Sequence, residues 1–264
     1  MEKYNFFKGT SPLIISAPHV GSYIPKDIAS RMTDIGQQSV DSDWHVDRLY
    51  DFAKEMNVSI LSATHSRYVV DLNRPHDDQN LYPGQDTTGL SPVNSFSHEN
   101  LYKSAEAVPT QKEIEMRVET YWRPYHDKLR ETLEENLTKH GYALLWDAHS
   151  IRSEVPRFFE GRLPDMNLGT ANGSSCASEL EQRLLEVAKA HKEFSHVLNG
   201  RFKGGHITRH YGDPSRNIHA VQLEQSQITY MNESAPFNLI PEKVTECQPL
   251  LKNFIQTMLD FKPT

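Results

Sequence analysis

Short apolar runs of strand length alternate along this chain with longer stretches of helical periodicity. The runs occur at residues 12–16, 58–63, 142–146, 196–200 and 219–224. This alternation is typical of an α/β sheet with helices packed on its faces. The 264 residues lie near the upper limit for one core, and no linker, repeat or low-complexity tract divides them. We therefore expect an α/β fold in a single domain over residues 1–264.

Four stretches are predicted to be helical. Within residues 41–56, apolar side chains recur at steps of three and four, which places them on one helical face. A longer helix is predicted at about 111–139, with Pro124 as a candidate kink. Two further helices are expected at 176–193 and 241–260.

Two stretches show neither strand nor helix periodicity. Residues 75–108 are rich in Asp, Asn, Ser, Pro and Gly, and residues 150–175 follow the third predicted strand. Long loops inside compact domains are usually functional lids or disordered segments. Because residues 75–108 directly follow the sequence DLNR, we favour a lid.

Composition excludes several classes of partner and site. No run reaches the roughly 18 apolar residues that span a membrane, and the first residues lack the pattern of a secretory signal, so we expect a cytoplasmic protein. A net charge of -7 argues against a nucleic-acid partner, because phosphate binding needs a positive surface. Cys176 and Cys247 form no CxxC pair, so any metal must be held by His and carboxylate side chains.

Two histidines follow predicted strands. His19 comes after the first strand, and His149 comes after the third within the sequence WDAHS. Open α/β sheets bind ligands at the carboxyl ends of their strands. A single histidine in such a place is more often a structural hydrogen-bonding group than a ligand. Two of them at one sheet edge favour a metal site.

A catalytic zinc usually takes three protein ligands, so a third is expected from an acid near the same edge. The candidates are Asp41, Asp43, Asp47 and Asp147. An aspartate in the first turn of a helix also caps free N–H groups, which is a strong alternative for the first three. Asp147 lies two residues before His149 on the same strand face, which suits it to orient an imidazole.

Glu224 ends the fifth predicted strand, in the sequence QLEQS. An acid in an apolar strand is costly unless it is paired or functional. Metal-dependent hydrolases need a carboxylate that takes a proton from the attacking water and passes it to the leaving nitrogen. Glu224 is the candidate for this catalytic role. The alternative is a buried structural acid that is paired with an arginine such as Arg209.

Arginines cluster in two motifs. SRYVVDLNR contains Arg67 and Arg74, and GGHITRHYGDPSR contains Arg209 and Arg216. Each single arginine is best explained by a salt bridge, but together with two adjacent glycines they describe a pocket that binds carboxylates. The candidate substrate-binding residues are Arg74, Arg209, Arg216 and Asn73. The expected partner is a small anionic molecule.

The ordered series PHVGSYIP, DSDWHVDRLYDFA, SRYVVDLNRP, WDAHS, GGHITRHYGDP and QLEQS resembles the N-formylglutamate amidohydrolase family. The motifs run from residue 18 to residue 226. The resemblance implies a central mixed, mostly parallel sheet in a three-layer fold similar to zinc carboxypeptidases and cell-wall amidases. It also implies zinc, or another divalent metal, and hydrolysis of N-formyl-L-glutamate to formate and glutamate in histidine degradation.

The resemblance implies a role for each matching residue. His19 and His149 would be metal ligands, with Asp43 preferred over Asp41 as the acidic ligand, and Glu224 would be the catalytic acid. Other readings remain open: a hydrolase of another N-acyl amino acid or of a peptidoglycan amide, or a non-catalytic module that binds a dicarboxylate. The missing secretion signal counts against a cell-wall substrate.

Overall fold

The computed structural model describes residues 1–80, 84 and 86–263. Within these residues, one seven-stranded sheet has the order β1-β3-β2-β4-β7-β5-β6. The strands are β1 (Tyr4–Phe7), β2 (Leu13–Ala17), β3 (Ser59–Ala63), β4 (Ala143–Ile151), β5 (Met166–Gly169), β6 (His196–Leu198) and β7 (Ile218–Ser226). The pairs β1-β3 and β5-β7 are antiparallel, and the other neighbours are parallel. The predicted mixed, mostly parallel sheet is confirmed.

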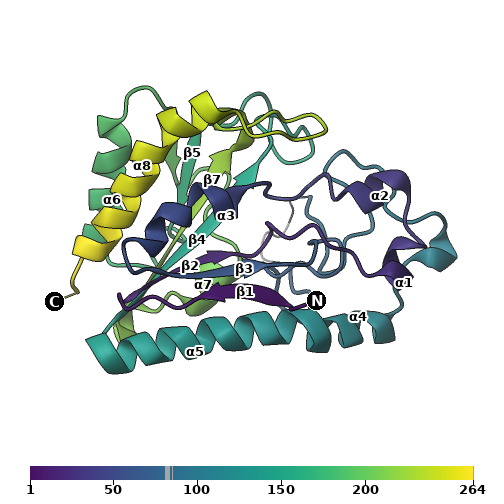
Figure 1. Ribbon diagram of the computed structural model, residues 1–264, viewed down its shortest axis with the longest axis horizontal. Helices are drawn as coiled ribbons and strands as arrows, with labels where there is room; N and C mark the ends of the chain where they lie inside the picture. Colours follow the sequence, from purple (N-terminus) through teal and green to yellow (C-terminus); the bar gives the residue numbers. More distant parts are fainter. Residues whose placement is uncertain (81–83, 85, 264) are drawn as a thin grey trace.

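Helices cover both faces of the sheet (Figure 1). One face packs against α3 (Val46–Leu49), α6 (Ser178–Ala190) and α8 (Pro241–Asp260) around a core that includes Trp146 and Phe254. The other face packs against α5 (Arg123–His140) and α7 (His206–Tyr211). Alternate residues of the central strands enter the two cores, as with Ile14 and Ile15 of β2. The result is a three-layer α/β/α architecture.

Two strands were missed and two are longer than predicted. The sequence shows no strand signal for β1 or for β5, and β5 lies within the stretch 150–175 that was expected to be irregular. Strand β4 continues to Ile151 and β7 to Ser226, so His149 lies inside a strand rather than after it, and Glu224 lies two residues before the end of its strand. The polar residues at these strand ends conceal the strand pattern because they line the site instead of the core.

The main difference between the predicted and the observed helices lies at residues 41–56. Residues 41–56 do not form one helix: α3 is followed by a 3₁₀ helix at Asp51–Lys54, and His45 before α3 has a left-handed backbone with φ 66°. Most of the predicted apolar face is nevertheless buried in the core, and Met56 is partly buried against it. The long helix is present as α4 (Gln111–Arg117), a π-helical turn at Val118–Trp122 and α5, with Pro124 in the first turn of α5. Helices α6 and α8 agree with the predictions at 176–193 and 241–260.

The stretch 75–108 lies between β3 and α4, and its later part packs against a lobe formed by α1 (Lys26–Ala29) and α2 (Asp34–Gln38), drawn on the right of Figure 1. Its described residues form only isolated bridges and one 3₁₀ turn at Ala105–Ala107, which agrees with the predicted loop. Leu101 and Tyr102 pack into a small core of this lobe. The part of the predicted loop at 81–83 and 85 lies outside the described residues.

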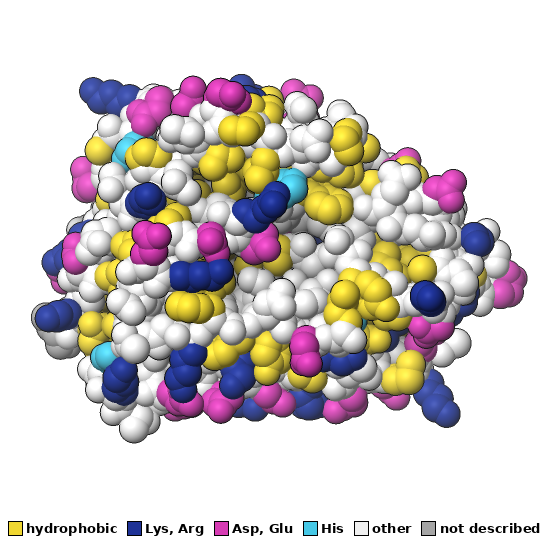
Figure 2. All heavy atoms as spheres, viewed as in Figure 1, with side chains coloured by type: hydrophobic (Ala, Val, Ile, Leu, Met, Phe, Trp, Pro, Cys, Tyr) yellow, Lys and Arg dark blue, Asp and Glu magenta, His cyan; other side chains and the backbone are white. Residues whose placement is uncertain are grey.

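Basic and acidic side chains are interspersed over the face shown in Figure 2. This face therefore presents no continuous basic surface of the kind that binds nucleic acid. Among the helices of the described residues, none has both the length and the apolar character needed to cross a membrane.

A candidate metal site at the carboxyl ends of the central strands

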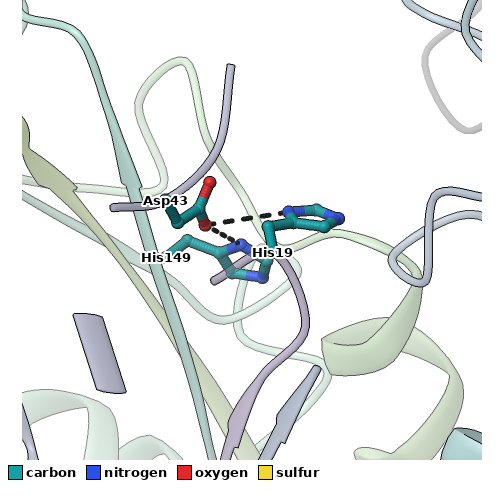
Figure 3. A group of neighbouring side chains, drawn as sticks. All are labelled: His19, Asp43 and His149. Atoms are coloured by element: carbon teal, nitrogen blue, oxygen red, sulfur yellow. Dashed lines mark hydrogen bonds and ion pairs between the residues drawn. The ribbon is translucent and has the colours of Figure 1, made fainter. Parts of the chain in front are cut away.

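Three predicted ligands come together at one edge of the sheet. His19 follows β2, His149 lies near the carboxyl end of β4, and Asp43 lies in the segment before α3. Each offers one ligand atom, and these atoms all lie within 4.8 Å of one another. Figure 3 shows the Asp43 carboxylate pointing toward both imidazole rings. All three side chains are buried.

Backbone contacts hold the Asp43 carboxylate at this point. The N–H of Asp43 donates to the carbonyl of His19 (3.0 Å), which ties the two segments together. Asp43 Oδ2 lies 3.0 Å from Nδ1 of His149 and 3.7 Å from Nδ1 of His19, and it accepts from the N–H of Ser150 at 3.2 Å. Gly21 allows the turn after His19, because a Cβ there would lie 2.4 Å from the carbonyl oxygen of His65.

A second carboxylate lies behind each histidine. Nε2 of His19 is 2.7 Å from Oδ1 of Asp71, and Nε2 of His149 is 3.1 Å from Oδ1 of Asp147. Asp147 also accepts a hydrogen bond from the Thr208 hydroxyl (3.0 Å). Paired carboxylates of this kind fix the orientation and tautomer of histidines that bind metals. The placement agrees with the predicted position of Asp147, whereas sequence reasoning did not assign this position to Asp71.

The site concentrates acidic side chains. Its four buried carboxylates are Asp43, Asp71, Asp147 and Glu224. The guanidinium of Arg67 lies beside them, 2.6 Å from Asp71 and 3.8 Å from Asp43, with 11% of its side chain exposed. Buried charges are costly unless they are paired, so this excess of carboxylate favours a bound cation.

The pKa values reflect these contacts. Burial opposes the charged form of Asp43, but hydrogen bonds with His149 and His19 outweigh it and hold its pKa below the ordinary value. Burial likewise opposes ionisation of Asp71, and the Arg67 charge outweighs it, so the pKa of Asp71 lies well below the ordinary value. Burial raises the pKa of Glu224 to about 8.

The other candidate acids have different surroundings. Asp41 accepts a hydrogen bond from the Tyr68 hydroxyl (2.5 Å) and one from the N–H of Phe96 (2.8 Å), so it anchors the loop that contains Phe96. Asp47 is exposed on α3 and borders a different surface depression, beside β1. Of the four aspartates considered from sequence, Asp43 is the one grouped with both histidines.

Glu224 lies beside this group on β7. In the parallel pairing of β4 and β7 it is the register partner of His149. Gln222, on the same face of the strand, accepts from the N–H of Gly205 (2.7 Å) through Oε1. Its Nε2 therefore faces Glu224 and lies 3.3 Å from Oε2. Gln222 was not singled out from sequence.

These residues line one cavity. His19, His149 and Glu224 form part of its wall, together with Asn73 and Arg74. Nδ2 of Asn73 lies 3.0 Å from Nε2 of His149, while Oδ1 of Asn73 accepts from the N–H of Ile207 at 2.8 Å. Arg74 donates to the Thr88 hydroxyl at 3.4 Å.

Sequence reasoning missed part of the cavity wall. Thr87, Thr88 and Phe96 of the predicted lid border the cavity, as do Phe158, Arg201 and Phe202. The rings of Phe96 and Phe158 pack edge to face, with their centres 4.9 Å apart. Arg201 lies three residues before the GG motif, and its positive charge close to that motif was the available signal.

The two remaining arginines are placed differently. Arg216 precedes β7, at the end of the strand opposite Glu224, and forms an ion pair with Glu134 of α5 (2.8 Å) with about half of its side chain exposed (55%). The expectation that Arg216 lines the pocket is therefore wrong. The GGHITRHYGDPSR motif continues past the pocket to the opposite ends of the strands. Arg209 is half-buried on α7, where its Nε donates to the carbonyl of Gly204 (2.7 Å). Among the described residues, it is not part of the cavity wall.

The sequence model of the N-formylglutamate amidohydrolase family matches residues 11–231. The chain belongs to this family. All four residues that the motifs proposed for the site, His19, Asp43, His149 and Glu224, lie within the matched segment.

Relatives in the N-formylglutamate amidohydrolase family match almost the whole chain. The N-formylglutamate deformylase of Pseudomonas putida is 49% identical over 255 residues, which are 97% of this chain and 95% of that protein. The N-formylglutamate deformylase of Pseudomonas aeruginosa is 47% identical over 258 residues, which are 98% and 96% of the two chains.

Crystal structures share the fold. That of the N-formylglutamate amidohydrolase from Ralstonia eutropha has a TM-score of 0.82 at 22% identity, and the match covers 98% of this chain and 96% of that one. The structure of a protein from Agrobacterium tumefaciens has a TM-score of 0.73 at 17% identity, with 97% and 95% covered. At these identities the similarity establishes the fold alone.

The residues of this amidohydrolase fit a divalent metal. Within the described part of the chain, Nδ1 of His19 is buried and forms no hydrogen bond. It lies beside a second imidazole nitrogen and a carboxylate, and this N, N, O donor set suits zinc. A cation at this point would also balance the surrounding carboxylates.

Proposed function

We propose that this protein is a metal-dependent N-formylglutamate deformylase that hydrolyses the formamide C–N bond of N-formyl-L-glutamate to formate and L-glutamate. One observation carries the proposal: His19, Asp43 and His149 converge beside Glu224 in a cavity that arginines border. The two relatives that are named for this activity share nearly half of the residues over almost the full length. The reaction would be the last step of a histidine degradation route.

Zinc is the proposed metal, and His19, Asp43 and His149 are its proposed ligands. When bound, the ion would polarise the formyl carbonyl and make a water acidic enough to attack near neutral pH. Asp71 and Asp147 would each accept the Nε2 proton of one histidine, so that both Nδ1 lone pairs face the side on which Asp43 lies. Arg67 would keep the Asp71 and Asp43 carboxylates ionised and in place.

Glu224 is the proposed proton carrier. Its carboxylate would take a proton from the attacking water and deliver it to the departing amine nitrogen. Two features support this role: its position beside His149 across the β4-β7 pair, and the contact of Oε2 with Gln222. Burial in the cavity would exclude competing water.

Substrate binding is assigned to the polar wall. Asn73 lies next to His149, and Arg74 follows it in the chain, so both are placed to contact an anionic substrate close to the reacting bond. A guanidinium binds carboxylate through two parallel N–H groups, which suits the α-carboxylate of an N-formyl amino acid.

Release of formate by the purified protein tests this function. We expect N-formylglutamate to be hydrolysed in preference to N-acetylglutamate, activity to disappear with a chelator, and zinc to restore it. A tenfold or greater preference for N-acetylglutamate would assign another substrate. A metal-free protein that binds N-formylglutamate without hydrolysing it would favour a binding module.

A further inference from the structure

The cavity wall carries three arginines from three separate segments. Arg67 follows β3, Arg74 lies directly before the predicted lid, and Arg201 lies in the turn after β6. The guanidinium of Arg67 pairs with Asp71 and Asp43 and is largely covered, so its charge belongs to the proposed metal site. Arg74 and Arg201 are the two arginines of the wall that lie outside this group.

Arg201 is held in place from several sides. Its Nε donates to the carbonyl of Phe158 (2.6 Å). Its guanidinium lies 5.8 Å from the ring centre of Phe158 and 5.4 Å from that of Phe202, within the range of cation–π contact. A positively charged group that is fixed before binding loses little entropy when it meets an anion.

The backbone that carries Arg201 is also anchored. The carbonyl of Lys203 accepts from the N–H of Ala171 (2.6 Å), and the N–H of Asn199 donates to the carbonyl of Leu168 (2.8 Å). Both contacts join the turn to β5 or to the segment directly after it. The position of Arg201 is therefore set by the sheet rather than by a loose loop.

Arg74 and Arg201 lie at different distances along the sheet from the reacting groups. Arg74 directly follows Asn73 in the chain, and the Asn73 side chain contacts His149. Arg201 follows β6, and β6 is two strands away from β7 and three from β4. Arg74 therefore belongs to the wall segment that contacts a proposed metal ligand, whereas Arg201 belongs to the wall segment that follows β6.

N-formylglutamate carries two carboxylates at unequal distances from the bond that breaks. The α-carboxylate is attached to the carbon that bears the formamide nitrogen, and the side-chain carboxylate is separated from that carbon by two methylene groups. We propose that Arg201 binds the side-chain carboxylate and thereby selects an acidic over a neutral side chain, while Arg74 binds the α-carboxylate. The aromatic rings of Phe158 and Phe202 provide an apolar wall for the methylene groups.

This inference rests on the proposed function, and a comparison of two substrates tests it separately. N-formylglutamine has the same shape as N-formylglutamate but a neutral side chain. For Arg201→Gln we expect kcat/KM on N-formylglutamate to fall by about 10- to 150-fold, the loss typical of one charged hydrogen bond. On N-formylglutamine, kcat/KM should stay within about twofold of wild type, so that the preference for the acid collapses. Arg74→Gln should lower kcat/KM on both substrates by similar factors.

Arg162→Gln is the matched control, because Arg162 pairs with Asp165 at the surface and more than half of its side chain is exposed (57%). It should keep the wild-type preference. If Arg201→Gln does not fold, Arg201→Met retains the apolar stem against the phenylalanine rings, and the same collapse is expected.

Each outcome has one meaning. A folded Arg201 variant that keeps the wild-type preference, or that loses equally on both substrates, overturns the assignment of Arg201 and leaves the proposed function intact. If the wild-type enzyme hydrolyses neither substrate, the proposed function itself is wrong.

Discussion

Glu224 is the register partner of His149 across the parallel strands β4 and β7. Register partners in a parallel pair direct their side chains to the same face of the sheet, so the proposed proton carrier and a proposed metal ligand stand next to each other on adjacent strands. Two separate motifs, WDAHS and QLEQS, are thereby joined into one site by sheet pairing. This relationship underlies the first prediction.

Glu224→Gln should fold and keep its metal but lose turnover. The amide retains the shape of the side chain, including its contact with Gln222, and cannot accept a proton. We expect kcat to fall by about 100- to 10,000-fold, the usual contribution of general acid–base catalysis. Turnover, zinc content and melting temperature should be measured on one sample. Full activity per folded, zinc-loaded molecule would show that Glu224 is a structural acid.

Asp43→Ala should abolish metal binding, while Asp47→Ala should leave it unchanged. Asp43 offers a carboxylate oxygen beside both histidines, whereas Asp47 is exposed on α3. Zinc content after dialysis distinguishes the two variants. Asp41→Ala should mainly lower the melting temperature, because Asp41 anchors Tyr68 and Phe96. Loss of zinc from the Asp47 variant, with zinc retained in the Asp43 variant, would mean that Asp47 and not Asp43 is the acidic ligand.

Asp147→Asn should weaken the metal without removing any ligand. Asp147 lies 3.1 Å from Nε2 of His149, and an amide there is a poorer partner for the imidazole proton. Replacing a carboxylate behind a metal-binding histidine typically costs about 10- to 100-fold in metal affinity. Competition with a chelator of known affinity measures the change. An unchanged affinity would mean that Asp147 serves only its hydrogen bond with Thr208.

Arg216→Ala should behave as wild type in the assay. Its guanidinium pairs with Glu134 at the opposite end of β7, outside the cavity. Arg74→Ala should lower kcat/KM by about 10- to 150-fold, as expected when one charged hydrogen bond to a substrate carboxylate is lost. Steady-state kinetics of the two variants provide the comparison. Equal losses of kcat/KM in both variants would contradict the proposed binding of the substrate carboxylate by Arg74.

The stability of the fold should fall on acidification below about pH 6.5, partly because of His126. Burial first, and then the nearby His206, hold the pKa of His126 well below its ordinary value. Its ring lies between the Leu72 carbonyl (2.8 Å) and the Tyr211 hydroxyl (2.9 Å). Below pH 6.5 the unfolded chain binds a proton at this histidine that the folded chain does not, so stability decreases toward acid by up to about 1.4 kcal/mol per pH unit.

The matched measurement is the free energy of unfolding between pH 7 and pH 5 for wild type and His126→Gln. The variant should be less stable at pH 7, because it loses packing against Trp122, yet it should show a shallower decline toward acid. Parallel pH dependences would mean that His126 takes up its proton in the folded protein as well.

Much of the fold could be predicted from local sequence patterns. Apolar runs identified the central strands β2, β3, β4 and β7, and helical periodicity identified α5, α6 and α8, because these elements bury regular faces in the two cores. The motifs also marked His19, His149 and Glu224, since a polar group in or after a buried strand is unusual enough to be noticed without a structure.

The sequence could not decide contacts between segments that are far apart in the chain. It left four aspartates open, and only the fold brings Asp43 to the histidines while directing Asp41 to Tyr68. Asp71 and Arg201 were missed because their roles depend on which segments the fold brings together. Arg216 was misplaced because its motif, although continuous in sequence, runs from the carboxyl ends of the strands to their amino ends. Sequence patterns report which side chains a local element buries. The choice of partner is made when strands pair and loops close over the sheet edge, and that depends on tertiary structure.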